Sequence, residues 1–133
     1  MKYLLDTNIC IHFFKGQFGL IEKFREIGFE EFAISEITLA ELMYGAEKSQ
    51  NIVKNKQVVE KFAEKITILP IFNAIEIYGK EKARLKTKGI IISDLDLFIG
   101  ATAIVNNMIL ITRNIREFKR LENIRIENWI DHK

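Results

Sequence analysis

Short apolar runs alternate along the chain with segments in which apolar residues recur every three or four positions. The runs predict five strands, over residues 2–5, 31–35, 66–69, 108–111 and 124–127. The segments between them predict seven helices, over residues 8–14, 18–27, 37–48, 52–65, 73–86, 95–106 and 115–121. Alternating helices and continuously apolar strands are typical of a parallel sheet covered on both faces. The pattern therefore predicts an α/β fold.

Composition narrows the class of protein. A chain of 133 residues, 48% hydrophobic and 29% charged, fits a single folded domain, residues 1–133. The net charge of +2 does not by itself indicate nucleic-acid binding. Cys10 is the only cysteine, so no intramolecular disulfide can form and a reducing compartment is expected. With no signal-peptide pattern and no apolar stretch of membrane-spanning length, we expect a soluble cytoplasmic protein.

Polar residues gather where the predicted strands end, which is where open parallel sheets form their sites. Asp6 follows the first strand, and residues 35–41 follow the second. Asp94 and Asp96 open the most apolar predicted helix, and residues 112–114 follow the fourth strand. These strand ends are the places to look for chemistry.

Asp6, Glu41 and Asp96 each allow a structural explanation. Asp6 and Asp96 stand where a carboxylate caps a helix, and Glu41 lies in a helix among apolar neighbours. If all three reach one cleft, however, they repel one another and raise one another's pKa unless a cation neutralises them. Oxygen ligands suit Mg²⁺ or Mn²⁺ rather than zinc. Carboxylates with Mg²⁺ are a common apparatus of phosphodiester cleavage.

The two histidines do not form a competing metal site. His12 and His132 lie far apart in the sequence. We expect His12 on a helix face and His132 in the C-terminal tail.

Five motifs occur in a characteristic order: LLDTN, ITLAEL, DLDLFIGATA, ITRNIREF and IRIENW. In this order they resemble the PIN-domain family, and more narrowly the VapC-type toxins of bacterial toxin–antitoxin pairs. The resemblance implies a three-layer α/β/α sandwich and Mg²⁺- or Mn²⁺-dependent endoribonuclease activity on RNA, with tRNA a plausible substrate. It also implies a homodimer, and an antitoxin that threads a segment into the active-site groove.

The resemblance assigns the catalytic and metal-binding roles to Asp6, Glu41 and Asp96. Asp96 is preferred to Asp94 because an aliphatic residue and then small residues begin three positions after it. Asp94 is expected to cap the helix or to support the site from outside. Many family members carry a fourth acid after the fourth strand. Here that position holds Asn114, and the next acid is Glu117, so the number of metal ions stays open. Supporting roles for water or phosphate are expected for Thr7, Asn8, Thr112 and Asn114.

The chain has two basic segments. Residues 80–88 precede the Asp96 helix, and residues 113–120 follow the fourth strand. Each is either a solvated helix face or a surface that holds an RNA backbone. The residues expected to contact RNA are Lys82, Arg84, Lys86, Arg113 and Arg116.

Two other classes stay open from the residues alone. A receiver-like phosphotransferase also places Asp at strand ends, although a haloacid-dehalogenase type would need an acid where Asn8 stands. A non-catalytic nucleic-acid-binding module of the same fold is the third class, and the intact acidic set argues against it.

Overall fold

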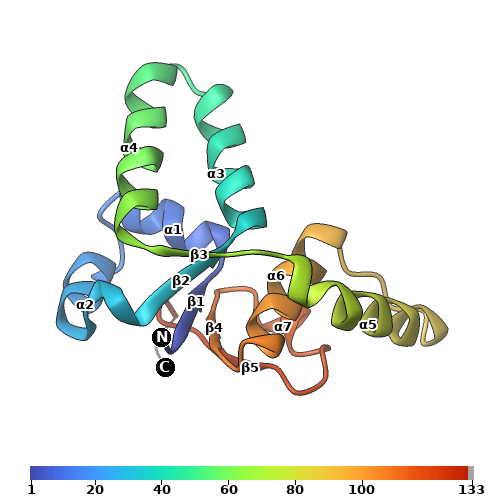
Figure 1. The fold of residues 1–133 in the computed structure, drawn as a ribbon. Helices are drawn as coiled ribbons and strands as arrows, with labels where there is room; N and C mark the ends of the chain where they lie inside the picture. The colour runs from blue at the N-terminus through green and yellow to red at the C-terminus, as the bar shows by residue number, and fades with distance from the viewer. Residues whose placement is uncertain (132–133) are drawn as a thin grey trace.

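The computed structural model describes residues 1–131, and His132 lies outside that range. Its centre is one five-stranded sheet in the order β3-β2-β1-β4-β5, with every neighbouring pair parallel (Figure 1). The strands are β1 Tyr3–Leu5, β2 Phe32–Ser35, β3 Thr67–Leu69, β4 Ile109–Ile111 and β5 Arg125–Glu127. Each begins one residue later than predicted and ends where predicted. The predicted parallel sheet is confirmed.

Alternate strand residues face two separate cores. Leu5, Ile34 and Ile111 pack into one core with residues of the helices α1 Thr7–Phe14, α2 Leu20–Ile27, α3 Glu36–Glu47 and α4 Ile52–Lys65. Leu4 and Leu110 pack on the opposite face with residues of α5 Ile75–Thr87, α6 Asp94–Val105 and α7 Ile115–Phe118. Because side chains alternate across a strand, both faces of the sheet are apolar and both are covered. The three-layer α/β/α sandwich is confirmed.

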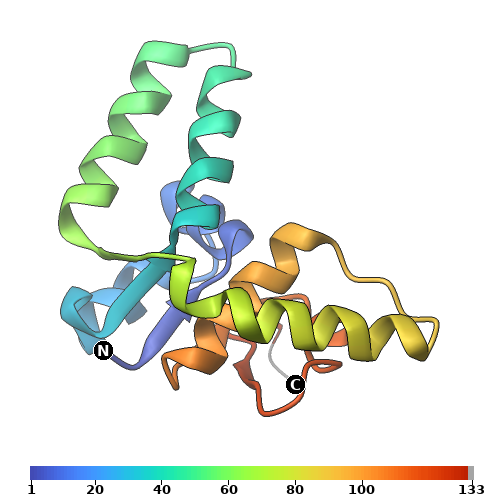
Figure 2. The ribbon, with the colours of Figure 1, turned by 45° about the vertical axis from the view of Figure 1, so that its right-hand side comes forward.

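The aromatic residues of the N-terminal third lie mostly in the first core. Phe24 contacts Phe13, Phe32 and Trp129. Trp129 is 6% exposed and packs the C-terminal segment onto the first core. Beyond this core, α3 and α4 extend past the sheet as a helical hairpin (Figures 1 and 2).

Some helix boundaries differ from the prediction. The second helix begins at Leu20 rather than Phe18, because Phe18 and Gly19 both have left-handed backbone conformations. Residues 72–74 form a separate 3₁₀ turn, η2 (Phe72–Ala74), so the predicted helix 73–86 runs from Ile75 to Thr87. The last helix ends at Phe118 rather than Leu121. Another short 3₁₀ turn, η1 (Phe29–Glu31), precedes β2.

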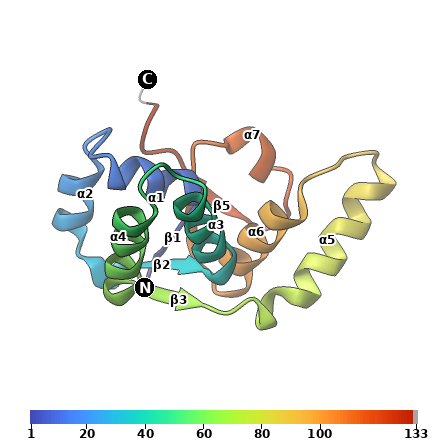
Figure 3. The same cartoon turned by 90° about the horizontal axis from the view of Figure 1, so that it is seen from above.

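The carboxyl edge of the sheet leads directly into helices. Asp6 caps α1 immediately after β1, and Ser35, the last residue of β2, caps α3. Figure 3 looks down on this edge, with α1, α3, α6 and α7 around it. Within residues 1–131, no helix has both the length and the apolar character that crossing a membrane requires.

Candidate active site

Asp6 and Thr112 join the ends of the two central strands. Asp6 follows β1, Thr112 follows β4, and the Thr112 hydroxyl donates to Asp6 Oδ2 over 2.8 Å. The backbone N–H of Thr7 donates to Asp6 Oδ1, also at 2.8 Å. The chain reverses its direction of winding between β1 and β4, and crevices at such points are the usual ligand sites of open α/β sheets. Asp6 is therefore held rigidly at the position most suited to a ligand.

Glu41 approaches the same place from α3. The Thr7 hydroxyl donates to Glu41 Oε1 at 2.5 Å, and it lies 3.2 Å from the hydroxyl of Thr38. Thr38 is buried and stands one helical turn before Glu41. Thr7 thus links the helix that Asp6 caps to the carboxylate of Glu41.

Asp96 enters from the first turn of α6. Ser93 caps this helix by accepting from the backbone N–H of Asp96 at 3.2 Å. Of the two roles expected for Asp94, the cap is wrong, because Ser93 caps the helix; Asp94 accepts from Tyr78 and Lys82 at 2.8 and 2.7 Å, and its support of the site from outside stays a prediction. Asp94 is thereby tied to α5 through its carboxylate.

Glu117 reaches the site because α7 and the turn after it pack closely on α6. A Cβ added at Gly100 would lie 2.3 Å from Leu121 Cδ1 and 3.4 Å from Phe118 Cδ1. Only a glycine allows this approach without displacing those side chains. The close packing brings the charge of Glu117 within reach of Asp96, which lies one turn before Gly100.

The acidic side chains influence one another's protonation. The pKa of Asp6 rises from 3.8 to about 6, mainly because the side chain is buried; the bonds from Thr112 and Thr7 oppose the rise, and the charges of Asp96 and Glu41 add to it. Burial also raises the pKa of Asp96; the Ser93 bond opposes this, and the charges of Glu41 and Glu117 add to it. The structure therefore brings the three predicted acids, with Glu117, into one electrostatic group.

No basic side chain in residues 1–131 forms a salt bridge with Asp6, Glu41 or Asp96. Within the same residues, no three His, Cys, Asp or Glu side chains are close enough to form a ready-made metal cage. Mg²⁺ keeps several of its waters and needs only one or two direct carboxylates. Asp6, Glu41 and Asp96 offer oxygen ligands without a basic partner in residues 1–131, which fits such an ion, whereas Glu117 pairs with Arg120 at 3.9 Å.

The predicted supporting residues divide into two groups. Thr7 and Thr112 hold Glu41 and Asp6 directly. The backbone N–H of Asn114 donates to the Thr112 hydroxyl at 2.9 Å, and its side chain is exposed, as is that of Asn8. Of the two residues considered for the fourth acidic position, Glu117 carries a charge that raises the pKa of Asp96, and the backbone N–H of Asn114 supports the Thr112 hydroxyl that binds Asp6; which of them fills that position stays a prediction.

Three of the five basic residues expected to contact RNA are engaged within the protein. Lys82 pairs with Asp94 at 2.7 Å, and Arg113 pairs with Asp131 through two contacts of 3.1 Å. Arg84 binds Glu81 through two nitrogens at 2.8 and 2.9 Å and donates to the carbonyl of Arg120 at 2.7 Å. Lys86 and Arg116 are exposed.

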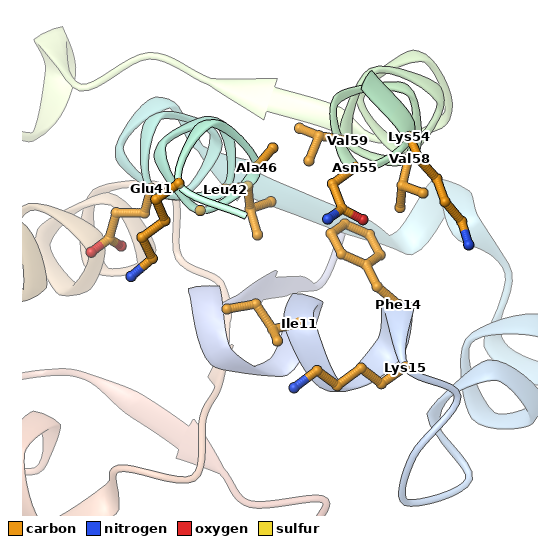
Figure 4. Close-up of a pocket in the computed structure, with 12 residues that line it drawn as sticks. Ile11, Phe14, Lys15, Glu41, Leu42, Ala46, Lys54, Asn55, Val58 and Val59 are labelled. Atoms are coloured by element: carbon orange, nitrogen blue, oxygen red, sulfur yellow. The ribbon is translucent and has the colours of Figure 1, made fainter. Parts of the chain in front are cut away.

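A mainly apolar pocket of about 550 Å³ adjoins Glu41. It lies between α1, α3 and α4, with Glu41 near one end and Phe14 further along it (Figure 4). Lys15, Lys48 and Lys54 also line it. An apolar segment of another chain bound here would lie beside the acidic group.

Sequence reasoning missed two residues of the site. Thr38 precedes Glu41 by three residues, the spacing that places two side chains on one helix face. Ser93 precedes Asp96 by three residues, which is the spacing of a capping box. Both signals were present in the sequence.

Comparison with known proteins agrees with this arrangement. The PIN domain family model matches residues 3–124. The chain is 38% identical over 132 residues to ribonuclease VapC2 of Haemophilus influenzae, covering 98% of this chain and 99% of the relative. It is 37% identical over 130 residues to the tRNA(fMet)-specific endonuclease VapC of Salmonella typhimurium, covering 97% and 98%.

A solved structure extends the comparison to the fold. A chain in the crystal structure of DNA-bound VapBC from Salmonella typhimurium superposes with a TM-score of 0.89 at 37% identity, covering 97% of this chain and 98% of that one. The protein thus belongs to the PIN-domain family, and its relatives within that family are VapC ribonucleases.

Proposed function

We propose that this protein is a Mg²⁺- or Mn²⁺-dependent endoribonuclease that acts as the toxin of a toxin–antitoxin pair. The observation that carries the proposal is that the charges of Asp96 and Glu41 act on Asp6, which ends β1 beside β4, while none of the three acids forms a salt bridge with a basic side chain in residues 1–131. Its full-length similarity to VapC ribonucleases supports the reaction class. One of those relatives is specific for tRNA(fMet), which supports tRNA as the substrate to test first.

The residues of the chain divide the work of the reaction. Asp6, Glu41 and Asp96 would hold the cation, and the charge of Glu117, which also pairs with Arg120, acts on Asp96. The bound ion supplies Lewis-acid stabilisation of the charge that develops on the phosphate. Thr112 and the Thr7 N–H keep both oxygens of Asp6 oriented, and the Thr7 hydroxyl orients Glu41. Held in this way, the carboxylates need little rearrangement when substrate binds.

A cognate antitoxin would block this site from the neighbouring pocket. The pocket is mainly apolar and adjoins Glu41, so an apolar antitoxin segment can bind there and carry a cationic side chain to the carboxylates. The VapBC complexes among the structural relatives support such a partner. A homodimer of this chain, and a larger assembly with the antitoxin, are part of the same proposal.

A receiver-like phosphotransferase fits less well. Receiver domains have the sheet order 2-1-3-4-5, whereas this sheet has the order β3-β2-β1-β4-β5.

Incubation of the purified protein with tRNA tests the function. We expect cleavage with Mg²⁺ or Mn²⁺, none with EDTA, and none by Asp6→Asn under any condition. Asp94→Asn is the matched control, because Asp94 is engaged with α5 and should leave the metal requirement intact. Cleavage that survives EDTA, or that survives in Asp6→Asn, contradicts the metal-dependent mechanism. RNA binding without cleavage by the wild type would favour the non-catalytic module.

A further inference from the structure

Phe18 is an exposed aromatic residue in an unusual backbone conformation. It is 47% exposed and has φ 59°, between Gly16 and Gly19, which both have φ 66°. The turn is closed by Gln17 N–H to the His12 carbonyl at 3.0 Å and Leu20 N–H to the Gln17 carbonyl at 3.2 Å. Bulky residues rarely adopt the left-handed region, so an exposed phenylalanine held there suggests a functional constraint.

Two further side chains fix the surroundings of this ring. The His12 ring meets it edge-on, with centroids 4.9 Å apart, and His12 is itself held by Gln17 through a contact of 2.7 Å. The Arg113 guanidinium lies over the Phe18 ring at 5.5 Å. We call Phe18, His12 and Arg113 the aromatic platform. Proteins that bind single-stranded RNA stack unpaired bases on aromatic rings and on arginine guanidinium planes.

The aromatic platform borders the candidate active site. Arg113 directly follows Thr112, whose hydroxyl donates to Asp6. His12 lies one helical turn beyond Asn8 on α1, the helix that Asp6 caps. The aromatic platform is thus built from residues that adjoin Asp6 and Thr112 along the chain, on the side where a nucleotide next to a phosphate at Asp6 would lie.

Arg113 has a contact that RNA can replace. Its Nε and Nη2 donate to the two carboxylate oxygens of Asp131, each at 3.1 Å, and both side chains are about half exposed. Such a solvated pair contributes little stability and is easily exchanged. Phosphate oxygens accept from the same guanidinium fork in the same bidentate manner.

We propose that the aromatic platform binds an unpaired nucleobase next to the cleaved bond, with the base stacked on Phe18 and its phosphate held by Arg113 in place of Asp131. The proposal rests on the ribonuclease function and adds a specific subsite to it. Other aromatic residues of the region are core residues, such as the fully buried Phe24. Phe72 is 77% exposed, and no ring or cation contact to it occurs within residues 1–131, so it serves as a matched control.

The test measures binding of a labelled single-stranded RNA by fluorescence anisotropy in the Asp6→Asn background, where cleavage is prevented. Phe18→Ala should weaken binding by about 5- to 100-fold, the range expected for loss of one stacked base. Phe18→Tyr should restore most of it, and Phe72→Ala should leave it unchanged. Circular dichroism and thermal unfolding verify that each variant is folded.

A second measurement separates stacking from a merely structural effect. A series of RNAs, each lacking the base at one position, is measured for binding. At one position, loss of the base should weaken binding to the protein that carries Phe18 and should have no effect on binding to Phe18→Ala. If the Phe18→Ala substitution and the removal of a base weaken binding independently, so that their free-energy losses add at every position of the RNA, the proposal is wrong. The proposal is also wrong if the wild type cuts RNA and Phe18→Ala binds RNA as well as the protein with Phe18 does. This includes the case in which Phe18→Ala loses only its binding to the antitoxin. If the wild type neither binds nor cuts RNA, the ribonuclease function itself fails, and this proposal fails with it.

Discussion

Replacing Asp6 by Asn should stabilise the metal-free protein. The Asp6 carboxyl is 7% exposed, and burial raises its pKa from 3.8 to about 6. Since the pKa of Asp6 is higher in the folded state than in the unfolded state, the folded protein binds more protons than the unfolded protein at pH values between the two pKa values. The free energy of unfolding therefore falls as the pH rises from about 4 through about 6, and the full penalty is present above that range.

The magnitude follows from the two pKa values. The difference between 3.8 and about 6 corresponds to about 3 kcal/mol of penalty at neutral pH. Asn removes the charge and can keep the bond from the Thr7 N–H. The Thr112 hydroxyl loses its charged acceptor, which costs about 1 kcal/mol. We expect Asp6→Asn to be about 2 kcal/mol more stable than the wild type at pH 7.5 in EDTA, while it loses cleavage.

Urea unfolding in EDTA at pH 7.5 and at pH 4 measures this effect. The gain should be present at pH 7.5 and absent at pH 4, where Asp6 is protonated in the folded wild type. Asp94→Asn is the control with the opposite sign, because Lys82 and Tyr78 lower the pKa of Asp94 and its charge is favourable. Added Mg²⁺ should stabilise the wild type more than Asp6→Asn. A wild type at least as stable as Asp6→Asn at pH 7.5, or a difference that persists at pH 4, would refute the reasoning.

Three further changes test other parts of the structure. Glu81→Gln should lower the free energy of unfolding by about 1–3 kcal/mol in urea at pH 7, because Glu81 is 8% exposed and binds Arg84. Arg84 lowers the pKa of Glu81 below its ordinary value of 4.5, so the loss of stability should shrink as the pH falls below 4.5. A loss that does not change with pH would mean that the charge of Glu81 does not stabilise the fold. Thr112→Val should reduce cleavage and weaken Mg²⁺ binding measured by calorimetry, and unchanged Mg²⁺ affinity would mean that the orientation of Asp6 is unimportant. Arg113→Ala should weaken RNA binding and reduce its salt slope by about 1, whereas Arg84→Ala should change stability but not that slope; equal slopes in the two variants would contradict the assignment.

The strands and most helices could be predicted because they depend on local pattern. Five apolar runs gave all five strands, and the helix 52–65 was predicted to the residue. The errors occurred where backbone conformation overrode side-chain periodicity. Phe18 continues the apolar pattern of the second helix, but it adopts a positive φ and lies outside that helix.

The candidate site could be predicted in part. Asp6, Glu41 and Asp96 stood out because parallel sheets place ligands at strand ends and because the motifs around them resemble the PIN-domain family; in the structure the charges of Asp96 and Glu41 raise the pKa of Asp6, and that of Glu41 raises the pKa of Asp96. The basic residues were harder to interpret from sequence alone. Arg84 reads as part of a positively charged run, yet in the structure it connects α5 to the segment after α7.

The sequence by itself determined the elements and their parallel arrangement, because periodicity is encoded locally, and its motifs, through the family resemblance, supplied the candidate site residues. The tertiary structure decided which of these residues meet. Asp6 and Thr112 are 106 positions apart and form one hydrogen bond because the sheet places β1 beside β4. Gly100 lets Phe118 of α7 and the following Leu121 pack closely on α6, and the charge of Glu117 on α7 acts on Asp96. Such contacts depend on strand order and packing distance, which no local pattern specifies.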